Sequence, residues 1–359
     1  MPPALATPGA SGSRRGRFLA GTLAAALAAT VAAQPAPTVR LRIVGGLANI
    51  HQYTRHEEPF WTRELPRLTG GRASAEIVPF DRAGIRGQEM LRLVQLGAVP
   101  FGTALLSQSS SFDAEVLAPD LAGLSPDVEA MRRHTAAFRP HLARVLRERY
   151  GIELLALYIY PAQELFCTRP LKGLANLSGR RVRVSSATQA DFVEALGAIP
   201  VQTGFADIVP NVRSGNIECA ITGTMSGHTI GLHEVTQYLH TAPITWGLAA
   251  FVANGSAWTA LPADVRGALE GALPKLEREI WSESARETGE GIACNVGAAG
   301  CTIATRGRMV EVPETEEDRR LRRDIFAKTV LPRWVQRCGA ACAQVWRRTI
   351  GPVSGIDVP

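Results

Sequence analysis

Residues 181–222 read RVRVSSATQADFVEALGAIPVQTGFADIVPNVRSGNIECAIT, and this stretch contains a complete alternation of strand and helix patterns. Valines alternate with arginines over 181–184, which is the two-residue period of a strand. The following segments predict a helix over 191–196 closed by Gly197, a strand over 199–202, a helix over 206–214 and a strand over 217–221. Strands that alternate with helices pair into a mostly parallel sheet, so this stretch predicts an α/β fold.

A similar alternation precedes this block. The patterns predict strands over 39–43, 75–78 and 101–106, with helices around 60–68 and 88–96 between them. Further strands are expected over 154–160 and 246–252. A long amphipathic helix is expected from Pro262 to Gly289, which is long enough to span two lobes. The two blocks predict two α/β domains.

The N-terminus has the layout of a signal peptide over residues 1–33. Arg14, Arg15 and Arg17 precede a nearly uncharged run from Phe18 to Ala33, and that run is too short for a membrane-spanning helix. The sequence does not distinguish Sec from Tat export. Without these arginines, 36 basic residues remain against 33 acidic ones, which gives a formal charge of about +3 and no footprint for a nucleic-acid partner.

The six cysteines all follow the predicted signal peptide. An exported chain keeps its cysteines in an oxidising compartment, so we expect disulfides. The sequence spacing favours Cys294 with Cys301 and Cys338 with Cys342, and it leaves open whether Cys167 pairs with Cys219. No CxxC motif or suitably spaced histidine accompanies them, so we expect neither cysteine pair to bind a metal.

Arg183 is the strongest candidate for a ligand-binding residue. Val182 and Val184 point to one face of their strand and Arg183 to the other, and the strand ends in serines just before a helix. Ligands of open α/β sheets bind at the carboxyl ends of strands, where helix N-termini favour anions. Arg183 is therefore placed to bind a carboxylate. The alternative is that Arg181 and Arg183 are both solvent-exposed strand residues.

At this point the sequence resembles a known family, the solute-binding subunits of tripartite ATP-independent periplasmic (TRAP) transporters of the DctP type. The resemblance covers most of residues 40–350 and rests on the order and spacing of several segments. These segments are 41–44, 69–72, 90–104, 179–184, 195–201, 205–208, 214–223 and 258–261.

The resemblance implies a two-lobed clamshell with strand hinges and a long helix that bridges both lobes. Residues 38–160 plus 249–285 would form the first lobe, and residues 161–248 plus 286–359 the second lobe with C-terminal helices. The implied protein is a monomeric periplasmic binding protein without a cofactor. It captures a small organic acid and delivers it to TRAP membrane subunits, with Arg183 holding the carboxylate through bidentate hydrogen bonds.

The chain departs from the family pattern near the expected ligand. Gln163 stands where many members have a second ligand-facing arginine, so the resemblance implies a monocarboxylate ligand. The remaining site candidates follow predicted strand ends: Asn49, Gln52, Gln108, Thr222, Thr224 and Trp246. Tyr158, Phe192 and Phe205 are expected in the core. Whether a metal ion assists ligand binding is left open.

An enzyme is the alternative from another functional class. No GxSxG, P-loop or GxGxxG motif is present, and His233-Glu234 lacks the second histidine of a HExxH zinc helix. A secreted α/β hydrolase or isomerase that anchors a carboxylate substrate on Arg183 remains the alternative. The absence of a fused signalling domain disfavours a sensor module. We expect a binding protein and not an enzyme.

Overall fold

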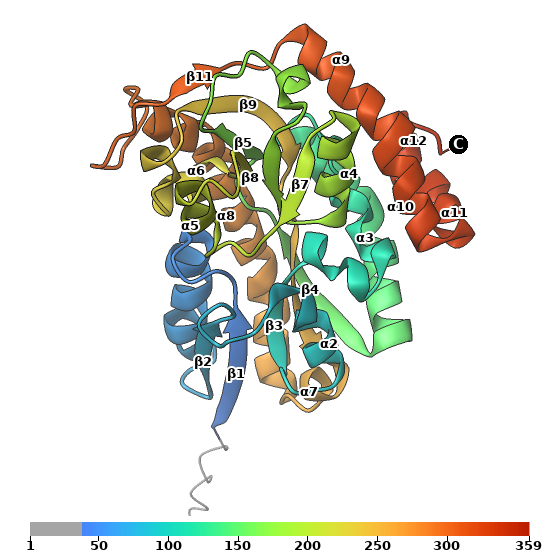
Figure 1. Cartoon of the computed structure of the whole chain (residues 1–359). Coiled ribbons are helices and arrows are strands. Elements are labelled where there is room, and N and C mark those ends of the chain that lie inside the picture. The colour runs from blue at the N-terminus through green and yellow to red at the C-terminus, as the bar shows by residue number, and fades with distance from the viewer. Residues whose placement is uncertain (1–37, 359) are drawn as a thin grey trace, which may run out of the picture. The chain divides into compact units, whose positions relative to one another are not determined.

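The computed structural model describes residues 38–358, which form two β-sheets surrounded by helices (Figure 1). The predicted signal peptide, residues 1–33, lies outside the described residues. Within 38–358, no helix combines the length and the apolar character that crossing a membrane requires.

The first sheet has the strand order β2-β1-β3-β10-β4. The strands β1, β2 and β3 are parallel, and β10 pairs antiparallel with both β3 and β4. The strands are β1 (Val39–Gly45), β2 (Ala73–Pro79), β3 (Phe101–Leu105), β4 (Ile152–Tyr158) and β10 (Ala249–Asn254). The helical segments that join them are η1 (Gln52–Glu57), η2 (Phe60–Glu64), α1 (Leu65–Leu68), η3 (Gly87–Glu89), α2 (Met90–Gln95), η4 (Leu106–Ser111), η5 (Ala114–Asp120), α3 (Val128–Tyr150) and α7 (Gly255–Thr259).

The second sheet contains the stretch 181–222 and has the order β11-β9-β5-β8-β6-β7. Its strands are β5 (Gln163–Cys167), β6 (Arg181–Val184), β7 (Ile199–Gln202), β8 (Cys219–Gly223), β9 (Tyr238–Thr245) and β11 (Val310–Val312). Its helices are η6 (Leu174–Leu177), α4 (Ala187–Ala195), α5 (Ile208–Arg213), α6 (Thr224–Thr229) and η7 (Leu232–Glu234). Each strand and helix predicted within 181–222 is present. The central strand β8 is buried throughout, as expected for a strand covered on both faces.

The chain passes from the first sheet to the second between β4 and β5, and it returns between β9 and β10. The two crossings lie side by side, because the Tyr160 N–H donates to the Trp246 carbonyl at 3.0 Å. The predicted long helix is α8 (Ala263–Val296), which Figure 1 shows running past both sheets. It is fixed to β4 by a hydrogen bond from Trp281 Nε1 to the Leu157 carbonyl (2.8 Å) and to the first crossing by one from Ser284 Oγ to the Ile159 carbonyl (2.7 Å).

The same helix packs tightly on the second sheet's side of the molecule. A Cβ atom added to Gly291 would lie only 2.3 Å from the backbone nitrogen of Met225 in α6. Backbone cannot move aside as a flexible side chain can, so α8 and α6 approach each other this closely only because residue 291 has no side chain.

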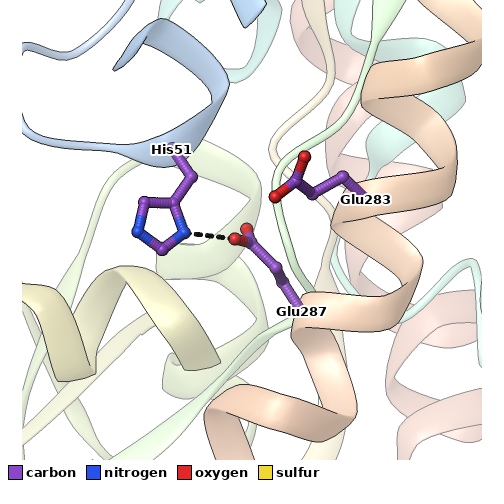
Figure 2. Close-up of side chains that lie close together, drawn as sticks. All are labelled: His51, Glu283 and Glu287. Atoms are coloured by element: carbon purple, nitrogen blue, oxygen red, sulfur yellow. Dashed lines mark hydrogen bonds and ion pairs between the residues drawn. The ribbon is translucent and has the colours of Figure 1, made fainter. Parts of the chain in front are cut away.

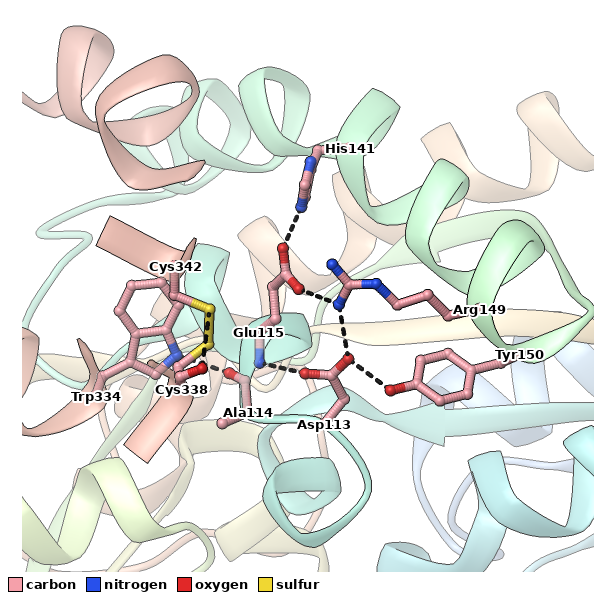
Figure 3. Close-up of a disulfide and its surroundings, with 9 residues drawn as sticks. All are labelled: Asp113, Ala114, Glu115, His141, Arg149, Tyr150, Trp334, Cys338 and Cys342. Atoms are coloured by element: carbon pink, nitrogen blue, oxygen red, sulfur yellow. Dashed lines mark hydrogen bonds and ion pairs between the residues drawn. A yellow bond between two sulfur atoms is a disulfide. The ribbon is translucent and has the colours of Figure 1, made fainter. Parts of the chain in front are cut away.

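The C-terminal segment consists of α9 (Glu316–Ile325), η8 (Phe326–Val330), α10 (Leu331–Cys338), α11 (Ala340–Arg348) and α12 (Ile350–Ser354). Figure 3 shows how this segment is attached next to η5 and α3. The buried Trp334 donates its indole N–H to the Ala114 carbonyl at 2.7 Å. Nearby, Arg149 of α3 lies 2.5 Å from Glu115 and 3.5 Å from Asp113.

Three disulfides join the six cysteines. The predicted pairs Cys294–Cys301 and Cys338–Cys342 are confirmed. Cys167 and Cys219, whose pairing the sequence left open, also form a disulfide, because they are directly opposite each other on β5 and β8. This bridge ties the middle of the second sheet, and the other two close short loops.

Candidate functional site

A small cavity lies where the two sheets meet. It is lined by Leu47, Leu105, Ser107, Gln108, Tyr160, Gln163, Arg183, Ser185, Phe205, Thr222, Gly223 and Ser226. These residues come from strand ends and crossings of both sheets, which is where ligands of α/β proteins bind. The cavity volume is about 30 Å³, enough for about two water-sized spheres. An organic acid needs more room, so its walls must separate for a ligand to enter.

Arg183 reaches this cavity because of the alternation in β6. Val182 and Val184 are fully buried in the core on one face of the strand, and Arg183 projects from the other face with 3% of its surface exposed. Three hydrogen bonds hold its guanidinium. Nε and Nη2 donate to the Thr203 carbonyl at 3.3 and 3.1 Å, and Nη1 donates to the Ile221 carbonyl at 2.8 Å.

The guanidinium of Arg183 makes no direct ion pair, although the Asp207 carboxylate is close enough to favour its charged form. No carboxylate oxygen of residues 38–358 lies within 4.0 Å of it, and burial lowers its pKa to about 10, so it stays charged at neutral pH. Its three hydrogen bonds occupy three of the five guanidinium N–H groups, which leaves one N–H on Nη1 and one on Nη2. Two N–H groups on neighbouring nitrogens match the two oxygens of a carboxylate.

The structure brings three further sequence-predicted residues to the same cavity. Gln163 at the start of β5, Thr222 near the end of β8 and Gln108 in η4 all line it. The Gln163 side-chain oxygen accepts hydrogen bonds from Gln189 Nε2 at 2.7 Å and from Thr245 Oγ1 at 2.9 Å. Gln163 is therefore held by the second sheet.

Asn49, Thr224 and Trp246 do not line this cavity. Asn49 is exposed and accepts from Arg82 Nη2 at 2.9 Å, whereas Thr224 Oγ1 donates to the Thr288 carbonyl of α8 at 2.9 Å. Trp246 is 3% exposed, and its indole N–H donates to the Ser125 carbonyl at 3.1 Å. Each of these polar groups has a partner within the fold. Gln52 is also absent from the cavity wall, and it donates to Glu57 at 3.5 Å.

Tyr160 and Phe205 line the cavity although the sequence analysis did not select Tyr160 and placed Phe205 in the core. The Tyr160 hydroxyl is buried and has no hydrogen-bond partner among the described residues. Burial raises its pKa, so the hydroxyl stays protonated and can donate to a ligand or accept from one. The sequence feature that could have indicated Tyr160 is its position directly before Pro161, in the first crossing between the sheets.

A hollow of about 440 Å³ adjoins the cavity and shares Leu47, Gln108 and Phe205 with it. Its other walls are formed by residues 80–88, after β2, and by residues 204–207, before α5. One wall of this hollow belongs to the side of the first sheet and the other to the side of the second sheet. We therefore take the hollow as the entrance, or mouth, of the cavity. Arg86 lies on it but already pairs with Glu89.

One group among residues 38–358 has the spacing of metal ligands: His51, Glu283 and Glu287, whose ligating atoms lie within 4.8 Å of one another. Figure 2 shows His51 beside Glu287 at the junction of the first sheet's side and α8. Arg55 Nη1 lies 2.8 Å from Glu283 and 3.8 Å from Glu287, and His56 also bonds Glu283. Arg55 already pairs with both carboxylates, so the group is better described as a network of ion pairs and hydrogen bonds.

Comparisons with known proteins agree with this arrangement. A C4-dicarboxylate-binding periplasmic protein, DctP, of Rhodobacter capsulatus is 25% identical over 211 residues. The match covers 58% of this chain and 62% of that protein, so the chain spans less than two thirds of this curated relative.

Solved structures match over nearly their whole length. DctP7 of Bordetella pertussis, an extracytoplasmic solute receptor binding pyroglutamic acid, has a TM-score of 0.77 at 22% identity, covering 87% of this chain and 99% of that one. A TRAP periplasmic solute-binding protein of Desulfovibrio salexigens with bound orotic acid has a TM-score of 0.78 at 16% identity, covering 89% and 99%. Both share the two-lobed α/β fold of this chain.

The family model of the bacterial extracellular solute-binding proteins of family 7, DctP, matches residues 51–315, which include every strand except β1 and every residue of the cavity wall except Leu47. Together with the two sheets, their adjacent crossings and the bridging helix, this match shows that the chain belongs to the DctP family of extracellular solute-binding proteins.

Proposed function

We propose that this chain is the solute-binding subunit of a TRAP transporter and that it binds a small monocarboxylate through Arg183. The observation that carries the proposal is the buried Arg183 guanidinium, which lacks a carboxylate partner and retains one N–H on each terminal nitrogen. Burying a charge without a partner is costly, so a protein keeps such a charge where a ligand supplies the partner.

The charge of the cavity supports a ligand with one carboxylate. Arg183 is the only charged side chain among the described residues that line the cavity. Arg213, another cationic residue of the second sheet's helices, pairs with Glu234 at 3.6 Å and does not line it. A second carboxylate would therefore be desolvated beside Gln163 without an opposite charge. Pyroglutamic acid, which the Bordetella relative binds, carries the single carboxylate that this charge favours.

Closure of the two lobes would complete the site. We assign residues 38–160 plus 249–285 to one lobe and residues 161–248 plus 286–359 to the other, with the mouth between residues 80–88 and 204–207. The small volume of the cavity favours a cycle in which the lobes open to admit the acid and close around it. We further propose that the closed monomer acts in the periplasm and delivers the acid, unchanged, to TRAP membrane subunits.

A thermal-shift screen of organic acids tests the ligand class. A ligand at 100 times its Kd adds about 2.7 kcal/mol of apparent stability, which is easily measured. We expect cyclic or keto monocarboxylates such as pyroglutamate to raise the Tm and succinate to leave it unchanged. Tight binding of succinate or malate without competition by any monocarboxylate would contradict the proposed charge of the ligand.

Mass spectrometry of the acid recovered from the purified protein separates binding from catalysis. We expect the acid to be released unchanged after prolonged incubation with the protein. Conversion of the acid into a product at a rate that depends on Arg183 would instead support the enzyme alternative.

A further inference from the structure

The amide group of Gln163 has a fixed orientation at the cavity wall. Its oxygen faces Gln189 and Thr245, which donate to it at 2.7 and 2.9 Å. Its nitrogen lies beside Tyr160 and Gly247 and has no hydrogen-bond partner among the described residues. A Cβ atom at position 247 would lie 2.8 Å from this nitrogen, so the glycine there, with φ of +60°, leaves the amide its space.

The cause of this orientation is a single backbone N–H group. Ser185 N donates to the side-chain oxygen of Gln189 at 2.8 Å, and a backbone N–H can only donate. The Gln189 oxygen must therefore face Ser185, and its nitrogen must face Gln163 and Thr245. Because that nitrogen also only donates, Gln163 must present its oxygen to it. Gln189 is fully buried, so water does not compete for these bonds.

We infer that Gln189 is a positioning residue that makes the Gln163 wall of the cavity a hydrogen-bond donor. The inference rests on the proposed function and narrows its ligand class. The free N–H groups of Arg183 and the NH₂ group of Gln163 both donate, so the ligand carries a hydrogen-bond acceptor in addition to its carboxylate. A lactam or keto carbonyl oxygen satisfies this requirement, because it accepts hydrogen bonds and cannot donate them.

A pair of matched acids measures this requirement. The acids 3-oxocyclopentanecarboxylate and cyclopentanecarboxylate differ only in the carbonyl oxygen, so the ratio of their Kd values isolates its recognition. We expect the wild-type protein to bind the keto acid about tenfold more tightly, because the acid without the carbonyl leaves the Gln163 amide unpaired. Calorimetry on Gln163→Leu should give a ratio near one.

The isosteric change Gln189→Glu tests the positioning role. One oxygen of the introduced carboxylate still accepts from Ser185 N, but the other now faces Gln163 as an acceptor. Gln163 must then turn its NH₂ group to position 189 and its oxygen to the cavity, which abolishes or reverses the preference for the keto acid. Once protonated, the introduced carboxyl group donates as the Gln189 amide does, so the wild-type ratio should return at acid pH. A mere packing role predicts no such pH dependence.

Two further variants control the experiment. Gln237 is exposed, so Gln237→Glu adds the same charge and should leave the ratio unchanged. Thr245→Val removes the second donor to Gln163 at nearly constant volume, and it provides the test if Gln189→Glu does not fold.

The outcomes separate the two proposals. If the wild type binds both acids equally well, the inference is wrong while carboxylate binding stands. The same holds if the ratio of the two Kd values is unaffected by Gln163→Leu, Gln189→Glu and Thr245→Val. A ratio that responds only to Gln163→Leu overturns the positioning role of Gln189. If the wild type binds no carboxylate, the proposed function itself fails.

Discussion

Arg183 in the second sheet and Glu57 in η1 are both buried ionisable side chains without an oppositely charged residue within 4.0 Å, but their surroundings differ. Glu57 is 1% exposed, and its carboxylate accepts from the Gly46 N–H at 2.6 Å, the Tyr158 hydroxyl at 2.5 Å and the Thr103 hydroxyl at 2.9 Å. Arg183 donates only to backbone carbonyls and keeps two N–H groups without a partner.

This difference distinguishes a buried group that serves the fold from a buried group that can bind a ligand. Burial raises the pKa of Glu57, while its hydrogen bonds oppose that rise, so the fold itself supplies what this carboxyl group needs. For Arg183, the fold supplies part of the hydrogen bonding and no direct ion pair. A buried ionisable group whose hydrogen bonding is complete is satisfied by the fold, and one whose hydrogen bonding is incomplete is available to a ligand.

The largest effect is expected from Arg183→Ala, measured as ligand affinity. Removing one partner of a buried charge pair costs roughly 2–5 kcal/mol, so affinity should fall at least about 30-fold. The free energy of unfolding should change little, because the variant also removes a desolvated charge. Arg183→Lys should restore little affinity, because an ammonium group lacks the planar pair of N–H donors.

Calorimetry on the three proteins measures this, with circular dichroism as the check on folding. A folded Ala variant that binds the acid within a few-fold of wild type would show that Arg183 is not the carboxylate ligand.

Glu57→Ala should have the opposite profile. It leaves the Gly46 N–H and two hydroxyl groups without their acceptor, so we expect the free energy of unfolding to fall by about 3 kcal/mol. Glu57→Gln should cost less, because its oxygen can still accept from Gly46. Urea denaturation measures both values. Were Glu57→Ala instead to weaken binding and leave stability intact, the distinction between the two charges would be lost.

His134 extends the comparison to a buried group that avoids a charge. It is 3% exposed, and burial lowers its pKa from 6.5 to about 4, so it is neutral in the folded protein. The unfolded chain binds a proton near pH 6.5 and the folded chain does not. The contribution of His134 is therefore present above pH 6.5 and is lost as pH falls toward 4.

Converted from the pKa shift of His134 into free energy of unfolding, this loss amounts to at most about 3 kcal/mol. Stability measured between pH 7 and 4 should fall less steeply in His134→Asn than in wild type. Parallel pH profiles of the two proteins would show that the histidine is not the responsible group.

The smallest effect is expected at Arg322, a buried arginine that does have a counter-ion. It is 5% exposed, lies 3.2 Å from Glu314 and donates to the Gly123 carbonyl at 3.2 Å. Arg322→Met should lower the free energy of unfolding by only about 1 kcal/mol, because Glu314 keeps its contact with Arg319 at 3.0 Å. Ligand affinity should not change. A loss of affinity comparable to that of Arg183→Ala would mean that burial of an arginine does not distinguish the site.

The strand and helix order of 181–222 could be predicted because short valine-rich strands and glycine stops mark each element. The strand β9 lacks such marks. It contains His240 and Pro243, and a proline within a run argues against a strand. The helix α3 contains Pro140 and was not predicted, although it spans 23 residues and has the terminal marks of a helix, a capping Asp127 at its start and Gly151 at its end.

The site could be predicted only in part, because a strand end indicates a position and not a side-chain direction. Thr222 lines the cavity, but β8 ends at Gly223 and α6 begins at Thr224, so the alternation stops and Thr224 turns to α8 instead. The contacts of Gln189 with Gln163 and Thr245 join segments far apart in the sequence, and no local pattern indicates them.

The attachment of α8 limits how the two sheets can move. Its Glu277 carboxylate accepts from the Leu157 N–H at 2.9 Å in the first sheet, and Gly291 is packed against the backbone of α6 beside the second. A displacement of one sheet relative to the other that left α8 rigid would break one of these contacts. We therefore expect the proposed opening of the lobes to require bending of α8 between Glu277 and Gly291, so the stiffness of this one helix would set how far the lobes separate.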